Sequence, residues 1–170
     1  PALWGGSQMN PFYRMSLWLT SHIAPSLVLT GSNIEIMASD NIAMLIALGN
    51  DPLVIKETRV DTIYGLVNLM GEAQDNADKV TNNTLLLYGA NDQIIPAWAI
   101  DEAVQKLQAP HRIAFYPNGW HMLLRDKQSE VVWADIVSWI KDKKKDLPSG
   151  HGLTRKNAPS AFEEAFSKEQ

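Results

Sequence analysis

The chain has 170 residues, a formal net charge of −4 and no cysteine. Its length suffices for one domain with a buried core, and the negative charge argues against a nucleic-acid-binding protein, which usually carries a basic excess. The absence of cysteine excludes disulfides, cysteine nucleophiles and thiolate metal sites. No apolar stretch approaches the roughly 18 residues that a membrane span requires, and the histidines lack the spacing of a metal site.

The first 80 residues show the pattern of helices separated by turns. Predicted helices cover residues 12–24, 38–54 and about 56–74. In the first helix an apolar stripe recurs at helical spacing, formed by Phe12, Met15, Leu19 and Ile23. The second helix is predicted to begin at the capping pair Ser39 and Asp40 and to end at a Gly-Asn-Asp-Pro turn.

Residues 81–143 alternate strand, helix, strand and helix. The predicted strands cover 84–89 and 112–117, and the predicted helices cover 98–108 and 129–145. The first strand, TLLLYG, is almost continuously apolar, which is typical of a strand buried on both faces of a parallel sheet. In the last helix we expect four side chains to face inward: Val132, Ile136, Trp139 and Ile140. This order is that of a right-handed βαβ crossover, so we predict an α/β fold.

Two ionisable side chains follow the two predicted strands. Asp92 comes on the loop after the first strand, and His121 comes after the second strand behind a Pro-Asn-Gly turn. Neighbouring parallel strands lie about 4.8 Å apart and end at the same edge of a sheet, so we expect these side chains to form a hydrogen bond. Each residue alone is more often structural. Their combination within one βαβ unit favours an acid and base pair, because a carboxylate on one imidazole nitrogen leaves the other free to take a proton.

The segments around these two residues resemble a known family. YGANDQIIP (88–96) and FYPNGWHMLLRD (115–126) are similar to the C-terminal half of α/β-hydrolases, in particular the monoacylglycerol-lipase and lysophospholipase-like branch. In that family a catalytic triad runs Ser, Asp, His along the chain, and Asp92 and His121 match the acid and the base. NDPLV (50–54) resembles a segment of the family's helical cap.

The resemblance covers about residues 1–143 and implies the C-terminal part of an α/β-hydrolase fold. This part would be a mostly helical cap followed by a βαβα unit of a parallel sheet. It implies a segment that leaves the core sheet (1–8) and a helical cap (9–78). A core part with the acid and the base (79–145) and a flexible tail (146–170) follow.

The implied function is the hydrolysis of a carboxylic ester. A serine would attack the ester, and His121 would act as general base and then as general acid, oriented by Asp92, with no cofactor. The apolar composition of the cap favours a small lipophilic acyl ester, such as a monoacylglycerol or a lysophospholipid. We expect a cytoplasmic protein without a nucleic-acid partner.

The sequence lacks the serine elbow G-x-S-x-G of this family. The nearest match, GGSQM (5–9), has no second glycine and no flanking strand and helix, so Ser7 is interpreted as a loop serine. PALWGG (1–6) resembles the segment after the family's sixth core strand. We therefore expect the nucleophile upstream of residue 1, and we expect the 170 residues alone to be inactive.

Two alternatives stay open at this point. In the first, the chain is a non-catalytic short product or fragment that serves at most as a binding module. In the second, it is a relative of dehalogenases or perhydrolases with a different nucleophile or oxyanion environment. The strand at 84–89 needs neighbours on both sides, so an exposed sheet edge favours self-association.

The other candidate residues have ordinary interpretations. His22, His111 and His151 are interpreted as boundary or surface residues, and the lysine-rich segment 141–145 as a solvated helix end. The Met, Leu and Trp content of residues 9–48 fits two interpretations equally well, an ordinary core or the lining of an acyl-chain pocket.

Overall fold

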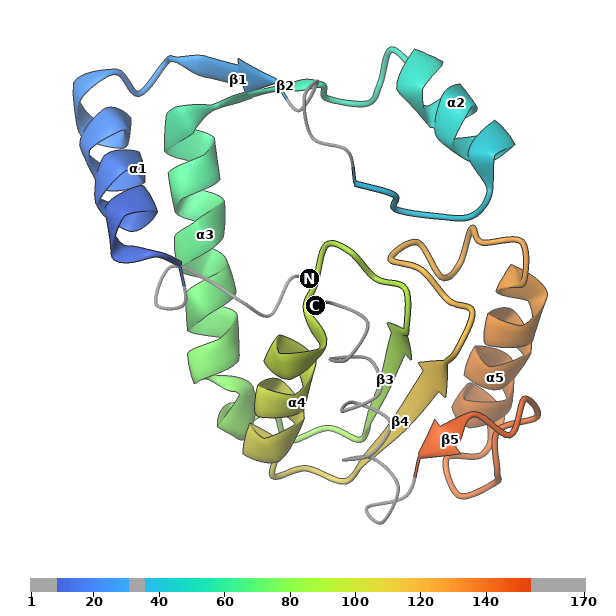
Figure 1. Cartoon of the computed structure of the whole chain (residues 1–170). Helices are drawn as coiled ribbons and strands as arrows, with labels where there is room; N and C mark the ends of the chain where they lie inside the picture. Colours follow the sequence, from blue (N-terminus) through green and yellow to red (C-terminus); the bar gives the residue numbers. More distant parts are fainter. Residues whose placement is uncertain (1–8, 31–35, 154–170) are drawn as a thin grey trace.

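The computed structural model describes residues 9–30 and 36–153, which form two units (Figure 1). The helical unit comprises residues 9–30 and 36–79, and the sheet unit comprises residues 80–153. Helices dominate the first unit and a small sheet with flanking helices forms the second. This mixed architecture confirms the predicted α/β class.

The helical unit contains α1 (Pro11–Ile23), β1 (Val28–Thr30), α2 (Ile42–Asn50), β2 (Glu57–Arg59), α3 (Val60–Asp75) and the short 3-10 helix η1 (Ala77–Lys79). Asparagine side chains cap the first two helices, because Asn10 accepts a hydrogen bond from the Phe12 amide at 2.9 Å and Asn41 from the Met44 amide at 3.2 Å. Helix α1 packs against α3 (Figure 1). The strand after α1, β1, pairs in antiparallel orientation with the strand before α3, β2.

The sheet unit contains β3 (Thr84–Gly89), α4 (Ala97–Lys106), β4 (His111–Tyr116), α5 (Ser129–Lys141) and β5 (Gly152–Leu153). The strand order is β3-β4-β5, and β3 and β4 are parallel, in register from Thr84 opposite His111 to Gly89 opposite Tyr116. Both strands therefore end at the same edge. The first strand was predicted with its observed bounds, and the second with a shift of one residue. Within the described part of the chain, no strand pairs with the outer edge of β3.

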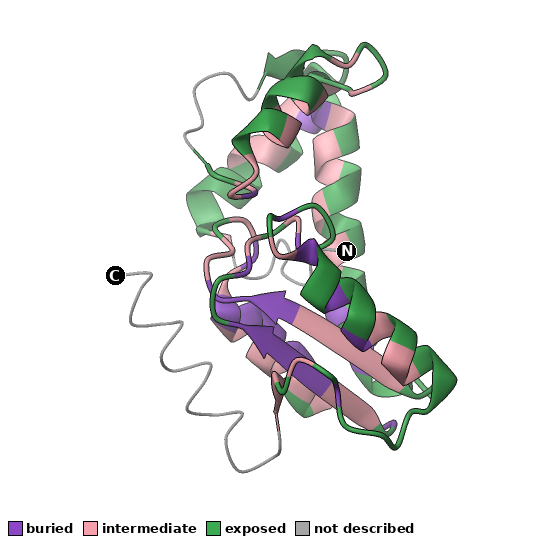
Figure 2. Ribbon diagram, turned by 90° about the vertical axis from the view of Figure 1, so that its right-hand side faces the viewer, coloured by how far each residue is buried: buried purple, intermediate pink, exposed green. Residues whose placement is uncertain are grey.

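Two hydrophobic clusters cover opposite faces of this sheet, since successive side chains of a strand alternate between faces. The cluster on the α4 side includes Tyr88, Ile95, Ile100, Ile113 and Phe115. The cluster on the α5 side includes Ala114, Tyr116, Leu123, Val132 and Leu147. Burial is deepest toward the carboxyl ends of the strands (Figure 2). Full burial of the whole run 84–89 was wrong, because only Tyr88 and Gly89 are buried there.

Residues 146–153, predicted as the start of a flexible tail, instead belong to the sheet unit. β5 pairs with Ile113 and Ala114 in antiparallel orientation. The buried Asp135 carboxylate accepts hydrogen bonds from the Tyr116 hydroxyl at 2.8 Å and from the Ser149 amide at 2.9 Å, and also from the Ser149 hydroxyl. Burial and the adjacent carboxylate raise the pKa of Tyr116. Polar contacts hold this segment, so apolar periodicity in the sequence could not predict its position. The rest of the predicted tail lies outside the described residues.

Some side chains of the predicted apolar helix faces are exposed. The α1 stripe of Phe12, Met15, Leu19 and Ile23 has exposed fractions between 47% and 74%, so the interpretation as an ordinary core is wrong for Met15 and Leu19. Ile140 is 65% exposed, whereas Val132, Ile136 and Trp139 do pack toward the sheet. The stripe at positions 132, 136 and 139 already fills the buried face of α5, so Ile140 turns to the outside.

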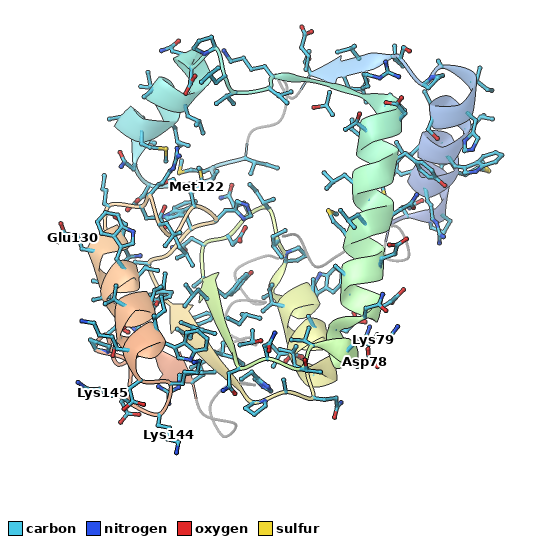
Figure 3. All side chains as sticks on the ribbon, turned by 180° about the vertical axis from the view of Figure 1, so that it is seen from behind. Asp78, Lys79, Met122, Glu130, Lys144 and Lys145 are labelled. Atoms are coloured by element: carbon cyan, nitrogen blue, oxygen red, sulfur yellow. The ribbon has the colours of Figure 1, made fainter. Side chains whose placement is uncertain are left out.

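The charges at the ends of α5 suit its dipole. Glu130 lies at the N-terminal end, and Lys144 and Lys145 lie just beyond the opposite end (Figure 3). The Arg112 guanidinium donates hydrogen bonds to the carbonyl oxygens of both lysines. None of the helices in residues 9–30 and 36–153 is long and apolar enough to cross a bilayer.

Candidate active site

Two loops meet at the carboxyl ends of β3 and β4. The loop after β3 donates backbone hydrogen bonds across to the turn after β4, from the Ala90 amide to the Tyr116 carbonyl at 3.0 Å and from the Asn91 amide to the Gly119 carbonyl at 2.9 Å. The Gly119 amide closes its own turn on the Tyr116 carbonyl at 3.0 Å. These contacts hold the loop that carries Asp92 against the loop that carries His121.

The carboxylate of Asp92 is almost completely enclosed, with a side-chain exposure of 6%. Its Oδ1 accepts hydrogen bonds from the amides of Ile94 and Ile95 at 2.8 and 2.9 Å. Its Oδ2 lies 3.0 Å from Nδ1 of His121. Two backbone amides therefore fix the carboxylate through Oδ1, and Oδ2 orients the imidazole of His121.

His121 contacts Asp92 through one nitrogen and keeps the other side of its ring open. A carboxylate is an acceptor, so Nδ1 carries the proton and Nε2 has a free lone pair. No side chain or amide in the described part of the chain forms a hydrogen bond with Nε2, and the side chain is 37% exposed. The hydrogen bond with Asp92 raises the pKa of His121 above its ordinary 6.5 although burial opposes this, and the charge of Asp126 adds to the rise.

The structure thus brings together the two residues that the sequence predicts as acid and base. It also shows a third ionisable residue that the sequence analysis missed. Asp126, only 1% exposed, accepts a hydrogen bond from the amide of Trp120, the neighbour of His121, at 2.8 Å. The available signal was an acidic residue five positions after the histidine, at the end of the segment HMLLRD.

The other candidates lie away from this pair. The His22 ring packs on Trp18 with ring centres 4.7 Å apart, the Nδ1 of His111 lies 3.0 Å from the Ala109 carbonyl, and the His151 ring lies edge-on to Tyr116. Ser7 lies outside the described residues. Among the described residues no serine hydroxyl forms a hydrogen bond with His121, and no group of three or more His, Asp or Glu side chains could hold a metal ion.

Comparisons with known proteins agree with this architecture. A family model described as serine aminopeptidase, S33, matches residues 1–128. The crystal structure of the monoacylglycerol lipase of Paleococcus ferrophilus is similar with a TM-score of 0.70 and 22% identity, over 82% of this chain and 55% of the lipase. Epoxide hydrolase 3 of Xenopus tropicalis is 38% identical over 64 residues, which are 38% of this chain and 17% of that protein.

The chain thus spans about half of the lipase and a smaller share of the epoxide hydrolase. At 22% identity the lipase shows the fold alone, whereas the family model extends over most of the chain. The predicted α/β-hydrolase resemblance is confirmed at the level of the superfamily, and the chain belongs to the serine aminopeptidase S33 family of α/β-hydrolases.

Proposed function

We propose that this chain supplies the general base, His121, and its orienting acid, Asp92, to an active site that hydrolyses carboxylic esters. The nucleophile would be a serine outside the described residues, in a part of the protein N-terminal to them. The observation that carries this proposal is the 3.0 Å hydrogen bond between the enclosed Asp92 carboxylate and Nδ1 of His121, with Nε2 left open.

Each group has a defined task in this reaction. Nε2 of His121 takes the proton of the serine hydroxyl while the serine oxygen bonds to the ester carbonyl carbon. The imidazolium then gives that proton to the departing alcohol oxygen as the carbon–oxygen bond breaks. Water next bonds to the acyl carbon and gives a proton to His121, and the imidazolium passes this proton to the serine oxygen as the acyl–serine bond breaks and the acid is released. Asp92 stays ionised and stabilises the imidazolium.

We further propose that the helical unit is the cap of the site and that the substrate is a small lipophilic acyl ester. The amide of Met37 donates a hydrogen bond to Oε1 of Gln93, the neighbour of Asp92, at 2.9 Å. The adjacent apolar side chains Ile36 and Met37 are 46% and 41% exposed, so they can contact an acyl chain beside the site. The likeness to a monoacylglycerol lipase supports the same substrate class. A cytoplasmic location stays a prediction.

The comparisons raise two other substrate classes. The similarity to serine aminopeptidases raises a peptide bond next to a free amino terminus, and the similarity to an epoxide hydrolase raises an epoxide. A panel of a monoacylglycerol, an aminoacyl anilide and an aryl epoxide separates these cases. Turnover of the glycerol ester alone supports the proposal, and turnover of either other compound in its place contradicts it.

The proposal is tested by intact-mass spectrometry of the protein at its natural length, before and after treatment with a fluorophosphonate probe. We expect a gain of one probe mass, and a loss of labelling in the His121→Gln variant. A species of 18.9 kDa that takes no label contradicts the hydrolase proposal for this polypeptide and favours the alternative of a non-catalytic binding module.

A further inference from the structure

Five consecutive residues of the helical unit, 37–41, lie on the two loops that carry Asp92 and His121. We call this segment the strap; it leads directly into α2. Each strap residue forms one hydrogen bond with a loop of the sheet unit, and all five distances are between 2.6 and 3.0 Å. The pairs are Met37 with Gln93, Ala38 with Met122, Ser39 with Asp126, Asp40 with Lys127, and Asn41 with Arg125.

The Ser39–Asp126 contact is the buried centre of the strap. Ser39 is 0% and Asp126 is 1% exposed. The Ser39 hydroxyl donates to Oδ1 of Asp126 at 2.6 Å, and the Trp120 amide donates to Oδ2 of the same carboxylate at 2.8 Å. A buried carboxylate is stable only while such donors replace water, so Asp126 depends on both of them.

The strap reaches the backbone on both sides of His121. On one side the Trp120 amide is bound to Asp126, which Ser39 holds in place. On the other side the Met122 amide donates to the Ala38 carbonyl at 2.9 Å, and Met122 lies where the loops of the sheet unit approach α2 (Figure 3). The two peptide N–H groups that flank the histidine residue therefore end on the strap or on a partner of the strap.

We propose that Ser39 and Asp126 are positioning residues for His121, and that the hydrogen bonds from Ser39 to Asp126 to Trp120 couple the placement of the segment before α2 to the orientation of the imidazole against Asp92. When the strap is seated, the histidine loop is fixed from both sides. When the strap lifts, Asp126 loses a donor and the loop is released. This inference rests on the proposed role of His121 as the base.

The coupling is measured by NMR hydrogen exchange on the full chain, which reads the hydrogen bonds without any turnover. The Ser39→Ala variant is expected to speed exchange of the Trp120 amide and the His121 Nδ1 proton by about tenfold or more, because it removes a hydrogen bond to a charged acceptor. Amides of β3 and β4 should keep their rates. Ser39→Thr, which retains the hydroxyl, should restore wild-type exchange at both positions.

Ser21→Ala is the matched control. Ser21 is also a buried serine of the helical unit, and its hydroxyl donates to the Trp18 carbonyl at 2.7 Å, away from the strap. This variant should leave His121 unchanged. The proposal is overturned if Ser39→Ala keeps wild-type exchange at His121, or if Ser21→Ala accelerates it equally.

A second variant covers the case in which Ser39→Ala does not fold. Asp126→Asn retains the size of the side chain but weakens the acceptor for the Trp120 amide, so exchange at Trp120 and at His121 should again rise. Wild-type exchange in this variant also overturns the proposal. The failure of this proposal and that of the hydrolase proposal are distinguishable. If the protein takes no fluorophosphonate label but Ser39→Ala still speeds exchange of the His121 Nδ1 proton, the hydrolase function is refuted and the coupling stands.

Discussion

Gly89 and Gly119 lie in direct backbone contact where the loop after β3 crosses the turn after β4. A Cβ atom on Gly89 would lie 2.5 Å from the carbonyl carbon of Gly119 and 2.7 Å from the Trp120 carbonyl oxygen. These neighbours are backbone atoms, so they cannot move aside as a flexible side chain could. The missing side chain of Gly89 thus lets the two loops approach closely enough for Asp92 to meet His121.

Gly89→Ala should therefore separate the loops. We expect a loss of about 1–3 kcal/mol or more in the free energy of unfolding, because a methyl group is forced into a filled space. Urea denaturation measures this loss. The NMR signal of the His121 Nδ1 proton should weaken in the folded variant. Unchanged stability together with an unchanged imidazole signal would contradict the close contact.

Gly65→Ala should have the opposite effect on stability. Gly65 lies in the middle of α3 and is exposed, and apart from its own helix backbone no atom of the described residues lies within 4 Å of the place where a Cβ would stand. Alanine lowers the conformational entropy of the unfolded chain and favours the helix, so we expect a gain of about 0.5–1 kcal/mol. The same urea titration checks this, and a decrease in stability would show that the α3 surface is covered.

Asp92→Asn should disable the base through its tautomer. The asparagine oxygen can still accept from the Ile94 and Ile95 amides, which turns its NH₂ group toward Nδ1 of His121. Nδ1 must then accept, the proton moves to Nε2, and no lone pair remains for a nucleophile. We expect fluorophosphonate labelling to slow by at least about a hundredfold. A labelling rate close to that of the wild type would contradict the assigned roles.

The same hydrogen bond predicts a dependence of stability on pH. Because the pKa of His121 is raised above its unfolded value of 6.5, the pair contributes most when the imidazole is protonated. This contribution is fully present below pH 6.5 and is lost as the pH rises through the raised pKa. The difference in unfolding free energy between wild type and Asp92→Asn should therefore shrink from pH 5.5 to 9, and a difference that grows would contradict it.

Tyr116→Phe tests the polar network that holds β5. It removes the hydroxyl that donates to the buried Asp135 carboxylate, so we expect a cost of about 1.5–3 kcal/mol. Tyr88→Phe is the matched control, because Tyr88 is also buried and donates to a neutral acceptor, the Ile95 carbonyl, at 2.8 Å. Its cost should be smaller, about 0.5–1.5 kcal/mol. Thermal unfolding of both variants gives the comparison, and equal costs would contradict a stronger hydrogen bond from Tyr116 to Asp135.

Parts of the fold that depend on local pattern could be predicted from the sequence. The run TLLLYG and the position of Asp92 and His121 after consecutive strands are local signals, and the structure agrees with them. The exposed stripe of α1 shows the limit of such patterns. Periodicity reveals that Phe12 and Leu19 share a face, but only the packing partner decides whether that face is covered.

Contacts between distant residues left no local signal. Ser39 and Asp126 are 87 positions apart, and in the sequence Ser39 is indistinguishable from an ordinary helix cap. The second helix was predicted to begin at the capping pair Ser39 and Asp40 but begins at Ile42 with Asn41 as its cap, because Ser39 and Asp40 bind the loops of the sheet unit. Ser149 likewise looks like part of a polar turn until Asp135 is placed beside it.

The NMR signal of the His121 Nδ1 proton depends on the register of β3 and β4. A slip of one residue between these strands would displace the histidine loop by about 3.3 Å and turn the side chains of β4 to the opposite face. A hydrogen bond of 3.0 Å to Asp92 does not survive such a displacement. The Nδ1 proton therefore reports strand alignment during refolding, since misaligned intermediates would lack its signal even when their helices and strands have formed.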